Sequence, residues 1–215
     1  MGEGGAVCTS DNELARIARS IRDWGRDCWC QTGQDNTCKK RFEWKLGNLP
    51  YGYDHKYIYS EIGYNLKNTD LNVAIGLAQM DKLSRFIKAR KSNFLLLSQK
   101  LSKFKQYFIL PRATENSKPS WFGFPITLKE NCPFSRKELL EFLTENKIGT
   151  RMLFAGNIIK QPYFTDNKIK YRVVGNLENT DFIMNNTFWI GVFPGIKSKQ
   201  ITHISNVFQK FLDRF

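Results

Sequence analysis

Apolar residues recur at helical spacing near the start of the chain. Within residues 11–22 they lie three or four positions apart, at Leu14, Ile17, Ala18 and Ile21. This spacing places them on one face of a helix and predicts an amphipathic α-helix. Ser10 and Glu13 have the S-x-x-E spacing of a capping box, which predicts the start of that helix. The glycine-rich residues 2–7 predict a turn that runs into a strand.

The longest helical pattern begins at Asp70. One face carries Leu71, Ala74, Ile75 and Ala78, and apolar residues continue at similar spacing to Leu101. No proline or glycine follows Gly76 in this stretch. The pattern predicts a helix of roughly 30 residues, which is the kind of element that connects two lobes.

The second half of the chain alternates between strand and helix patterns. Ser135 and Glu138 form a second capping-box pair and predict a helix through Asn146. The apolar stretches predict strands over residues 121–128, 148–154 and 187–193, and a closing helix over residues 198–213. Residues 111–119 and most of residues 155–185 lack periodicity and predict loops. This mixture favours a small α+β lobe.

Composition bounds the class of protein. The 215 residues are 41% hydrophobic and 14% aromatic, which is enough for a substantial core. No run of 18 apolar residues occurs, so we expect no membrane-spanning helix. The first residues, MGEGGAV, lack the charged and then apolar pattern of a signal peptide.

The formal net charge of +13 raises the question of an anionic partner. A basic surface attracts nucleic acid, anionic lipid or phosphorylated small molecules. The lysines and arginines are spread over the whole chain, however, and no motif for binding nucleic acid accompanies them. Scattered lysine is typical of a solvated surface, so charge alone predicts neither a nucleic-acid nor a membrane partner.

Three of the five cysteines lie within residues 23–44, where Cys28, Cys30 and Cys38 form a C-x-C-x7-C pattern. A loop rich in Gly, Gln, Asn and Asp can bring three thiolates to one centre. Such soft ligands select zinc, copper(I) or an iron–sulfur cluster. The spacing matches neither the common zinc pairs nor the ferredoxin patterns, and three free cysteines are the alternative. A tetrahedral site would need a fourth ligand, for which Cys8, water, substrate or another segment are candidates.

The clustering and odd number of cysteines indicate the redox state of the compartment in which the protein works. A disulfide framework uses an even number of cysteines distributed over the chain. Five cysteines, most of them on one loop, suit a reducing cytosol better. We therefore expect a cytoplasmic protein.

Several stretches together resemble the sugar aminotransferase and dehydratase family known as DegT/DnrJ/EryC1/StrS. The resemblance is carried by MGEGGAV at residues 1–7, GYNLKNTDLNVAIGLAQMDKL at 63–83 and RMLFAGNIIKQPYF at 151–164. Two further stretches, DWGRDCWCQTGQDNTC at 23–38 and LPYGYDHKYIYSEIGYN at 49–65, are similar to the iron–sulfur 3-dehydratases of that family.

The resemblance implies a fold and a division into domains. The fold would be α/β, the C-terminal part of a PLP-dependent transferase type I (aspartate aminotransferase-like) fold. Residues 1–68 would end the large cofactor-binding domain and contain the iron–sulfur loop at about 23–44. Residues 69–105 would form a long connecting helix, and residues 106–215 a small C-terminal α+β domain. Apolar surface is expected to be exposed where the rest of such a fold packs.

The resemblance also implies an activity. These dehydratases use pyridoxamine 5′-phosphate (PMP) and a 2Fe–2S cluster to remove the C3 hydroxyl of CDP-4-keto-6-deoxy-D-glucose. The reaction begins 3,6-dideoxyhexose synthesis for the O-antigen of lipopolysaccharide. The implied partners are a CDP-sugar substrate, a flavin- and iron–sulfur-containing reductase as electron donor, and a second copy in a homodimer. Neither nucleic acid nor membrane is implied.

The resemblance also implies site residues, which are matched one position at a time. Cys28, Cys30 and Cys38 match three of the four cluster ligands, and Trp29 and Trp44 are expected to shield the cluster from water. The family's fourth cysteine and its catalytic histidine lie upstream of Met1. The resemblance therefore implies no catalytic residue in this chain, which is expected to be inactive alone.

The remaining matches concern cofactor and substrate. Asn65 matches the asparagine that reaches the cofactor phosphate in the neighbouring subunit; without the resemblance it would be a turn or cap residue. Arg151, Gly156 and Asn157 match the substrate site, where a guanidinium suits a diphosphate, and His55 is a further candidate there. Neither His55 nor His203 takes the catalytic role, and His203 is predicted to be a surface or packing residue.

Two alternative functions stay open at this point. A sugar aminotransferase of the same family would bind PLP through a lysine, although the cysteine loop favours the dehydratase. A non-catalytic basic module would bind zinc through the same thiolates or associate with nucleic acid, in which case its affinity would fall steeply with salt.

Overall fold

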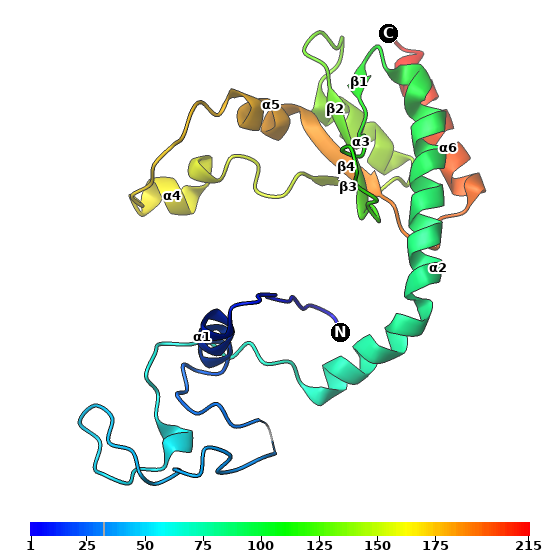
Figure 1. Ribbon diagram of the computed structural model, residues 1–215. Helices are drawn as coiled ribbons and strands as arrows, with labels where there is room; N and C mark the ends of the chain where they lie inside the picture. Colours follow the sequence, from blue (N-terminus) through cyan, green and yellow to red (C-terminus); the bar gives the residue numbers. More distant parts are fainter. Residues whose placement is uncertain (32) are drawn as a thin grey trace. The chain divides into compact units, whose positions relative to one another are not determined.

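The computed structural model describes residues 1–31 and 33–215, and Figure 1 shows its ribbon. The chain forms two compact units, Met1–Asp81 and Lys82–Phe215. The boundary between them falls inside helix α2, Asp70–Leu101, whose 32 residues confirm the predicted long helix. The predicted division at residues 68 and 105 stays a prediction.

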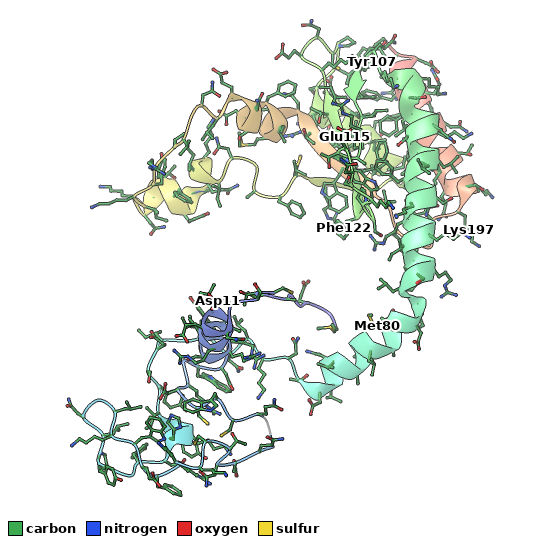
Figure 2. All side chains as sticks on the ribbon, viewed as in Figure 1. Asp11, Met80, Tyr107, Glu115, Phe122 and Lys197 are labelled. Carbon is green, nitrogen blue, oxygen red and sulfur yellow. The ribbon has the colours of Figure 1, made fainter. Side chains whose placement is uncertain are left out.

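The first unit begins with helix α1, Asn12–Arg22. Its N-cap is Asp11, whose carboxylate accepts hydrogen bonds from the amides of Glu13 and Leu14 at 2.8 and 3.1 Å (Figure 2). The predicted cap at Ser10 is therefore wrong by one residue, because Asp11 is the side chain that reaches the free amides of the first turn. No residue of α1 is buried within the described chain.

Residues 23–26 cross residues 59–65, and this crossing holds the rest of the first unit together. Isolated β-bridges join Asp23 to Asn65 and Arg26 to Tyr59. At the crossing, a Cβ added to Gly63 would lie 2.1 Å from the amide nitrogen of Gly25. Only glycine allows so close an approach of two backbones. The turn that follows α1 is thereby fixed against the segment that precedes α2.

The strand predicted within residues 2–7 is not formed, since the structure describes these residues as irregular. A strand needs a partner for its backbone hydrogen bonds, and no strand or bridge among the described residues pairs with this segment. Among the described residues of this unit, the short 3₁₀-helix η1, His55–Tyr57, is the regular element besides α1 and the first part of α2. The first half of α2 exposes Leu71 and Leu77 by 78% and 71%, which agrees with the expectation of exposed apolar surface.

The second unit contains an antiparallel sheet in the order β1-β2-β4-β3 (Figure 1). Its strands are β1 Phe108–Ile109, β2 Gly123–Leu128, β3 Thr150–Met152 and β4 Thr187–Gly191. Alternate residues of β2 are buried, as its pattern predicts. Three helices, α2, α3 (Arg136–Glu145) and α6 (Ser198–Leu212), complete the core with residues such as Leu97, Leu139 and Phe208.

The helices of this unit follow the predicted pattern more closely than its loops. The Ser135–Glu138 capping box forms as predicted. Residues 155–185 were predicted to be mostly loop but contain η3 Ile158–Lys160, α4 Pro162–Asp166 and α5 Glu178–Asn186. These elements are short, and α5 is stabilised by contacts with β2 and β4 rather than by a periodic pattern of its own. Within the described residues, no helix is both long and apolar enough to cross a membrane.

Candidate functional site

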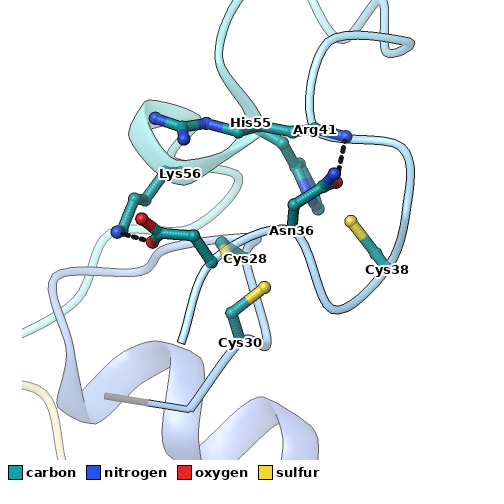
Figure 3. A pocket seen from close by; sticks show the side chains of 8 residues that line it. Cys28, Cys30, Asn36, Cys38, Arg41, His55 and Lys56 are labelled. Atoms are coloured by element: carbon teal, nitrogen blue, oxygen red, sulfur yellow. Dashed lines mark hydrogen bonds and ion pairs between the residues drawn. The ribbon is translucent and has the colours of Figure 1, made fainter. Parts of the chain in front are cut away.

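Cys28, Cys30 and Cys38 line one small pocket in the first unit (Figure 3). In this view the side chains of Cys30 and Cys38 point into the pocket from opposite sides. Two residues in left-handed conformation, Asn36 and Lys39, turn the loop back on itself. The Asn36 side chain also accepts a hydrogen bond from the Arg41 amide at 3.1 Å. The sequence spacing and the loop together bring the three thiols to one place.

The pocket changes the acidity of two of its thiols in opposite directions. The Thr37 hydroxyl donates a hydrogen bond to Cys30 Sγ at 3.0 Å and lowers the pKa of Cys30 to about 7. Burial raises the pKa of Cys28. Since thiolate is the form that binds a metal or attacks an electrophile, Cys30 is the most readily activated of the two.

His55 forms the inner wall of the same pocket. It is 1% exposed, its ring stacks on Trp44 at 4.7 Å, and it meets the edge of Trp29 at 5.2 Å. Its Nε2 lies 2.9 Å from Asp27 Oδ2, whereas its buried Nδ1 has no hydrogen-bond partner among the described residues. His55 was predicted to be a substrate residue, and the structure brings it to the cysteines. Both predicted shielding tryptophans contact it.

Two ion pairs hold the outer wall of the pocket. Arg41 donates two hydrogen bonds to the Asp54 carboxylate, at 3.0 and 2.6 Å, and thereby lowers the pKa of Asp54. Lys56 pairs with Asp35. Both cations line the pocket together with the thiols, each paired with its carboxylate. Asp27, Thr37 and Arg41 were not among the predicted site residues; their position within the cysteine loop was the available signal.

The donor set fits a thiolate-bound metal in chemical type, and its three cysteines line one pocket. Three sulfur ligands on one loop are what zinc and iron–sulfur centres use. Across residues 1–31 and 33–215, however, no group of three or more His, Cys, Asp or Glu side chains has the geometry to hold a metal ion. Neither Cys8 nor Cys132 lines the pocket, and Cys132 donates a hydrogen bond to the Tyr107 carbonyl in the second unit.

Asn65, predicted to reach a cofactor phosphate, is exposed and pairs with Asp23 through its backbone bridge. The bridge lies at the crossing described above, so the crossing fixes the backbone from which the Asn65 amide projects.

Gly156 and Asn157, two predicted substrate residues, form one tight turn in the second unit. Gly156 has φ +62°, and an added Cβ would lie 2.4 Å from Met184 Cγ. The Asn157 side chain is buried, donates to Asp181 Oδ1 at 2.8 Å and accepts from the Ile159 amide. Its amide group is therefore already engaged in holding this turn.

Arg151 and His203 lie on the surface of the second unit. Arg151 is exposed on β3, directly opposite Trp189 of β4, and donates a hydrogen bond to the Thr150 carbonyl. Its guanidinium is accessible to an anionic ligand. His203 is exposed on α6 and lies 3.0 Å from the Asn146 carbonyl through Nε2, which confirms it as a surface residue that packs against a neighbouring helix end.

Comparison with known proteins gives the family. Residues 1–209 match the model of the DegT/DnrJ/EryC1/StrS aminotransferase family. The chain belongs to this family. It is 57% identical over 211 residues to the lipopolysaccharide biosynthesis protein RfbH of Salmonella typhimurium, covering 98% of this chain and 48% of that protein. It is 49% identical over 211 residues to a dTDP-4-dehydro-2,6-dideoxy-D-glucose 3-dehydratase of Saccharopolyspora spinosa, with 98% and 45% coverage.

Solved structures of this family support the same fold. The structure of E. coli GDP-4-keto-6-deoxy-D-mannose-3-dehydratase with bound hydrated PLP matches with a TM-score of 0.72 and 26% identity, covering 93% of this chain and 48% of that one. The predicted PLP-dependent aminotransferase-like fold is thus confirmed. The chain spans about half the length of the curated relatives that it matches.

Proposed function

We propose that this chain is part of a dehydratase that uses PMP and a 2Fe–2S cluster to remove the C3 hydroxyl of CDP-4-keto-6-deoxy-D-glucose. The product would enter 3,6-dideoxyhexose and O-antigen synthesis. The observation that carries the proposal is the pocket lined by Cys28, Cys30 and Cys38. The 57% identity to a lipopolysaccharide biosynthesis protein supports the pathway.

The pocket lined by Cys28, Cys30 and Cys38, which we call the cysteine pocket, is the proposed cluster site. Cys28, Cys30 and Cys38 would supply three ligands, and the fourth would come from outside this set. A 2Fe–2S cluster held there would supply one-electron transfer from a flavin- and iron–sulfur-containing reductase. Replacing the C3 hydroxyl by hydrogen would require two electrons and two protons and would release water. Arg41 and Lys56, each paired with a carboxylate, would line the outer side of the site. The Trp29, Trp44 and His55 rings restrict water on the inner side.

Other residues of the chain serve the cofactor and the substrate. PMP would supply an amine and an electron sink to the 4-keto sugar when bound. The Asn65 amide would donate to the PMP phosphate in the neighbouring subunit of a homodimer. The exposed Arg151 would bind the diphosphate of the CDP-sugar. Since the Asn157 amide is bound to Asp181, we assign Asn157 and Gly156 the role of shaping the turn after β3.

The same geometry revises the role proposed for His55. Its ring is enclosed by two tryptophans and by Asp27, so we assign His55 to the cysteine pocket and not to the binding of the sugar. Neither His55 nor the exposed His203 matches the family's catalytic base. Proton removal from the cofactor would therefore require a group outside this chain.

A turnover assay on the protein extended upstream tests the proposal. CDP-4-keto-6-deoxy-D-glucose is incubated with PMP and a chemical one-electron reductant, and the sugar is analysed by mass spectrometry. We expect the unsubstituted protein to remove the C3 oxygen of the sugar. In Cys28→Ser this activity should be lost. The matched control Cys132→Ser, whose thiol lies in the second unit, retains the activity.

A second arm of the assay tests the aminotransferase alternative. Here PLP and glutamate replace PMP and the reductant. If a 4-amino sugar forms and Cys28→Ser does not affect its formation, the protein would be an aminotransferase and not a dehydratase. No sugar amination is expected.

A further inference from the structure

Helix α5 packs against the turn that follows β3. We call residues 153–157 the β3 turn. Its last residue, Asn157, is 2% exposed, and the side-chain Nδ2 donates to Asp181 Oδ1 at 2.8 Å. The backbone amide of Asn157 donates to Met184 Sδ at 3.3 Å, three residues further along α5. The side chain and the backbone of Asn157 are therefore both bound to the same helix.

The backbone of the β3 turn is in a conformation that needs support. Phe154 and Gly156 both lie in the left-handed region, with φ of +48° and +62°. This region is uncommon for a residue as bulky as phenylalanine, and its cost in free energy has to be balanced by surrounding contacts. A Cβ added to Gly156 would lie 2.4 Å from Met184 Cγ, so the turn lies directly against α5. Contacts with α5 are therefore what we expect to hold this conformation.

A closed frame connects the β3 turn to Arg151. Strand β4 begins at Thr187, directly after the last residue of α5, so the helix runs into the strand (Figure 1). Arg136 of α3 donates to the carbonyls of Met184 and Thr187, at 2.6 and 3.0 Å, on both sides of this junction. Strand β4 in turn pairs with β3, which carries Arg151 and leads into the turn. The β3 turn and Arg151 are thus held in fixed positions relative to each other.

Asp181 has two partners that differ in burial. Lys160 Nζ lies 2.8 Å from Asp181 Oδ1, and the Lys160 side chain is 53% exposed. The Lys160 ammonium and the Asn157 amide both hydrogen-bond the carboxylate and lower the pKa of Asp181. An exposed ion pair stabilises little, whereas a buried amide that loses its partner costs free energy. The hydrogen bond from Asn157 is therefore the contact that we expect to hold the turn.

We propose that Asp181 is a positioning residue of the nucleotide-sugar site, which acts by holding Asn157 and with it the β3 turn. The inference rests on the function proposed above, in which Arg151 binds the diphosphate of the CDP-sugar. Groups that are ordered before the ligand arrives cost less free energy on binding, so this hydrogen bond would raise the affinity for the nucleotide. Asp181 would act through Asn157 and would not contact the ligand itself.

Hydrogen exchange of this chain measures the β3 turn without a ligand. The amides of Asn157 and Ile159 donate to Met184 Sδ and to Asn157 Oδ1, so their protection reports on the turn. Asp181→Ala removes the acceptor of the Asn157 side chain, and exchange over residues 153–161 should become about 10-fold faster or more. Exchange in β2 and α6 should not change, which separates loss of the turn from a general loss of stability. Mass spectrometry of peptides measures both.

Calorimetry with CDP as the probe measures the effect on nucleotide binding. The titration uses the protein extended upstream. Asp181→Ala should weaken the binding of CDP about 10-fold, because the turn would then have to be ordered on binding. Lys160→Met is the matched control. It removes the exposed ion pair and keeps the hydrogen bond from Asn157, so the affinity should stay within about 2-fold of the unsubstituted protein.

Exchanging the two side chains tests the hydrogen bond itself. In Asn157→Asp alone, two carboxylates would face each other, so turn protection and CDP affinity should fall as they do in Asp181→Ala. Adding Asp181→Asn places a donor opposite an acceptor again, with the direction of the hydrogen bond reversed. The double variant should recover to within about 3-fold of the unsubstituted protein. Packing alone would give no such recovery, because Asn and Asp have nearly the same volume.

Three results would overturn the proposal. Unchanged exchange in Asp181→Ala would show that other contacts hold the turn. Faster exchange with unchanged CDP affinity would show that the order of the turn does not matter for the nucleotide. A lack of CDP binding by the unsubstituted protein would remove the nucleotide as the ligand. Failure of the proposed dehydratase function gives a different result, in which CDP binds with the expected dependence on Asp181 but the C3 hydroxyl is not removed.

Discussion

At the scale of single residues, the cysteine loop combines a chemical pattern with a local environment. The pattern C-x-C-x7-C is readable in the sequence. The hydrogen bond from Thr37 to Cys30 and the pair formed by Asp27 and His55 are not, because they depend on how a loop folds. Asp27 and His55 are 28 positions apart, with no regular element to fix their distance.

The Thr37 hydroxyl is expected to control the reactivity of Cys30. Its hydrogen bond is the main cause of the lowered pKa of about 7. In Thr37→Val the donor is lost, so the pKa of Cys30 should rise toward its ordinary value and the thiolate fraction at pH 7 should fall, by about 5-fold for the first unit of rise and about 10-fold for a second. Iodoacetamide alkylation of the metal-free chain at pH 7, mapped to Cys30 by mass spectrometry, measures this change.

The conservative variant Thr37→Ser provides the control for that experiment. Serine keeps the hydroxyl donor, so alkylation of Cys30 should remain close to the wild-type rate across the pH range. Equal rates in Thr37→Val and the wild type would mean that the hydroxyl does not activate Cys30.

At the scale of elements, helices with strong periodicity were predictable and contact-dependent elements were not. Helices α1, α2, α3 and α6 follow apolar repeats, and the Ser135–Glu138 capping box also marks the start of α3. Strand β1 has two residues and exists only because β2 pairs with it. Helix α5 is held by the sheet and by the hydrogen bond from Asn157 to Asp181, which no local pattern reveals.

The cap of α1 gives a direct test at this scale. Asp11→Ala removes the acceptor of two amide hydrogen bonds and should lower the stability of the helix by about 1 kcal/mol. Ser10→Ala is the matched control and should have almost no effect, although a capping-box pattern points to Ser10. Urea unfolding followed by circular dichroism measures both. A larger loss in Ser10→Ala would restore the cap predicted from sequence.

At the scale of the whole molecule, the chain consists of two units whose boundary lies within one helix. The cysteine pocket and Asn65 belong to the first unit, whereas Arg151, Gly156 and Asn157 belong to the second. Family membership explains the fold, and about half of each curated relative is matched. The sequence motifs predicted this fold because they span nearly the whole chain.

The cysteine pocket distinguishes the proposed dehydratase from an aminotransferase of the same fold. It is built from the C-x-C-x7-C loop, closed by His55 on one side and by Arg41 and Lys56 on the other. A shared fold carries many chemistries, so the activity has to be argued from this pocket.

The content of iron and acid-labile sulfide tests that claim most directly. The chain and a version extended upstream are purified without oxygen and analysed together with Cys28→Ser and the control Cys132→Ser. We expect about two irons and two sulfides per chain in the extended protein, their loss in Cys28→Ser and their retention in Cys132→Ser. Zinc in place of iron, or iron unaffected by Cys28→Ser, would contradict it.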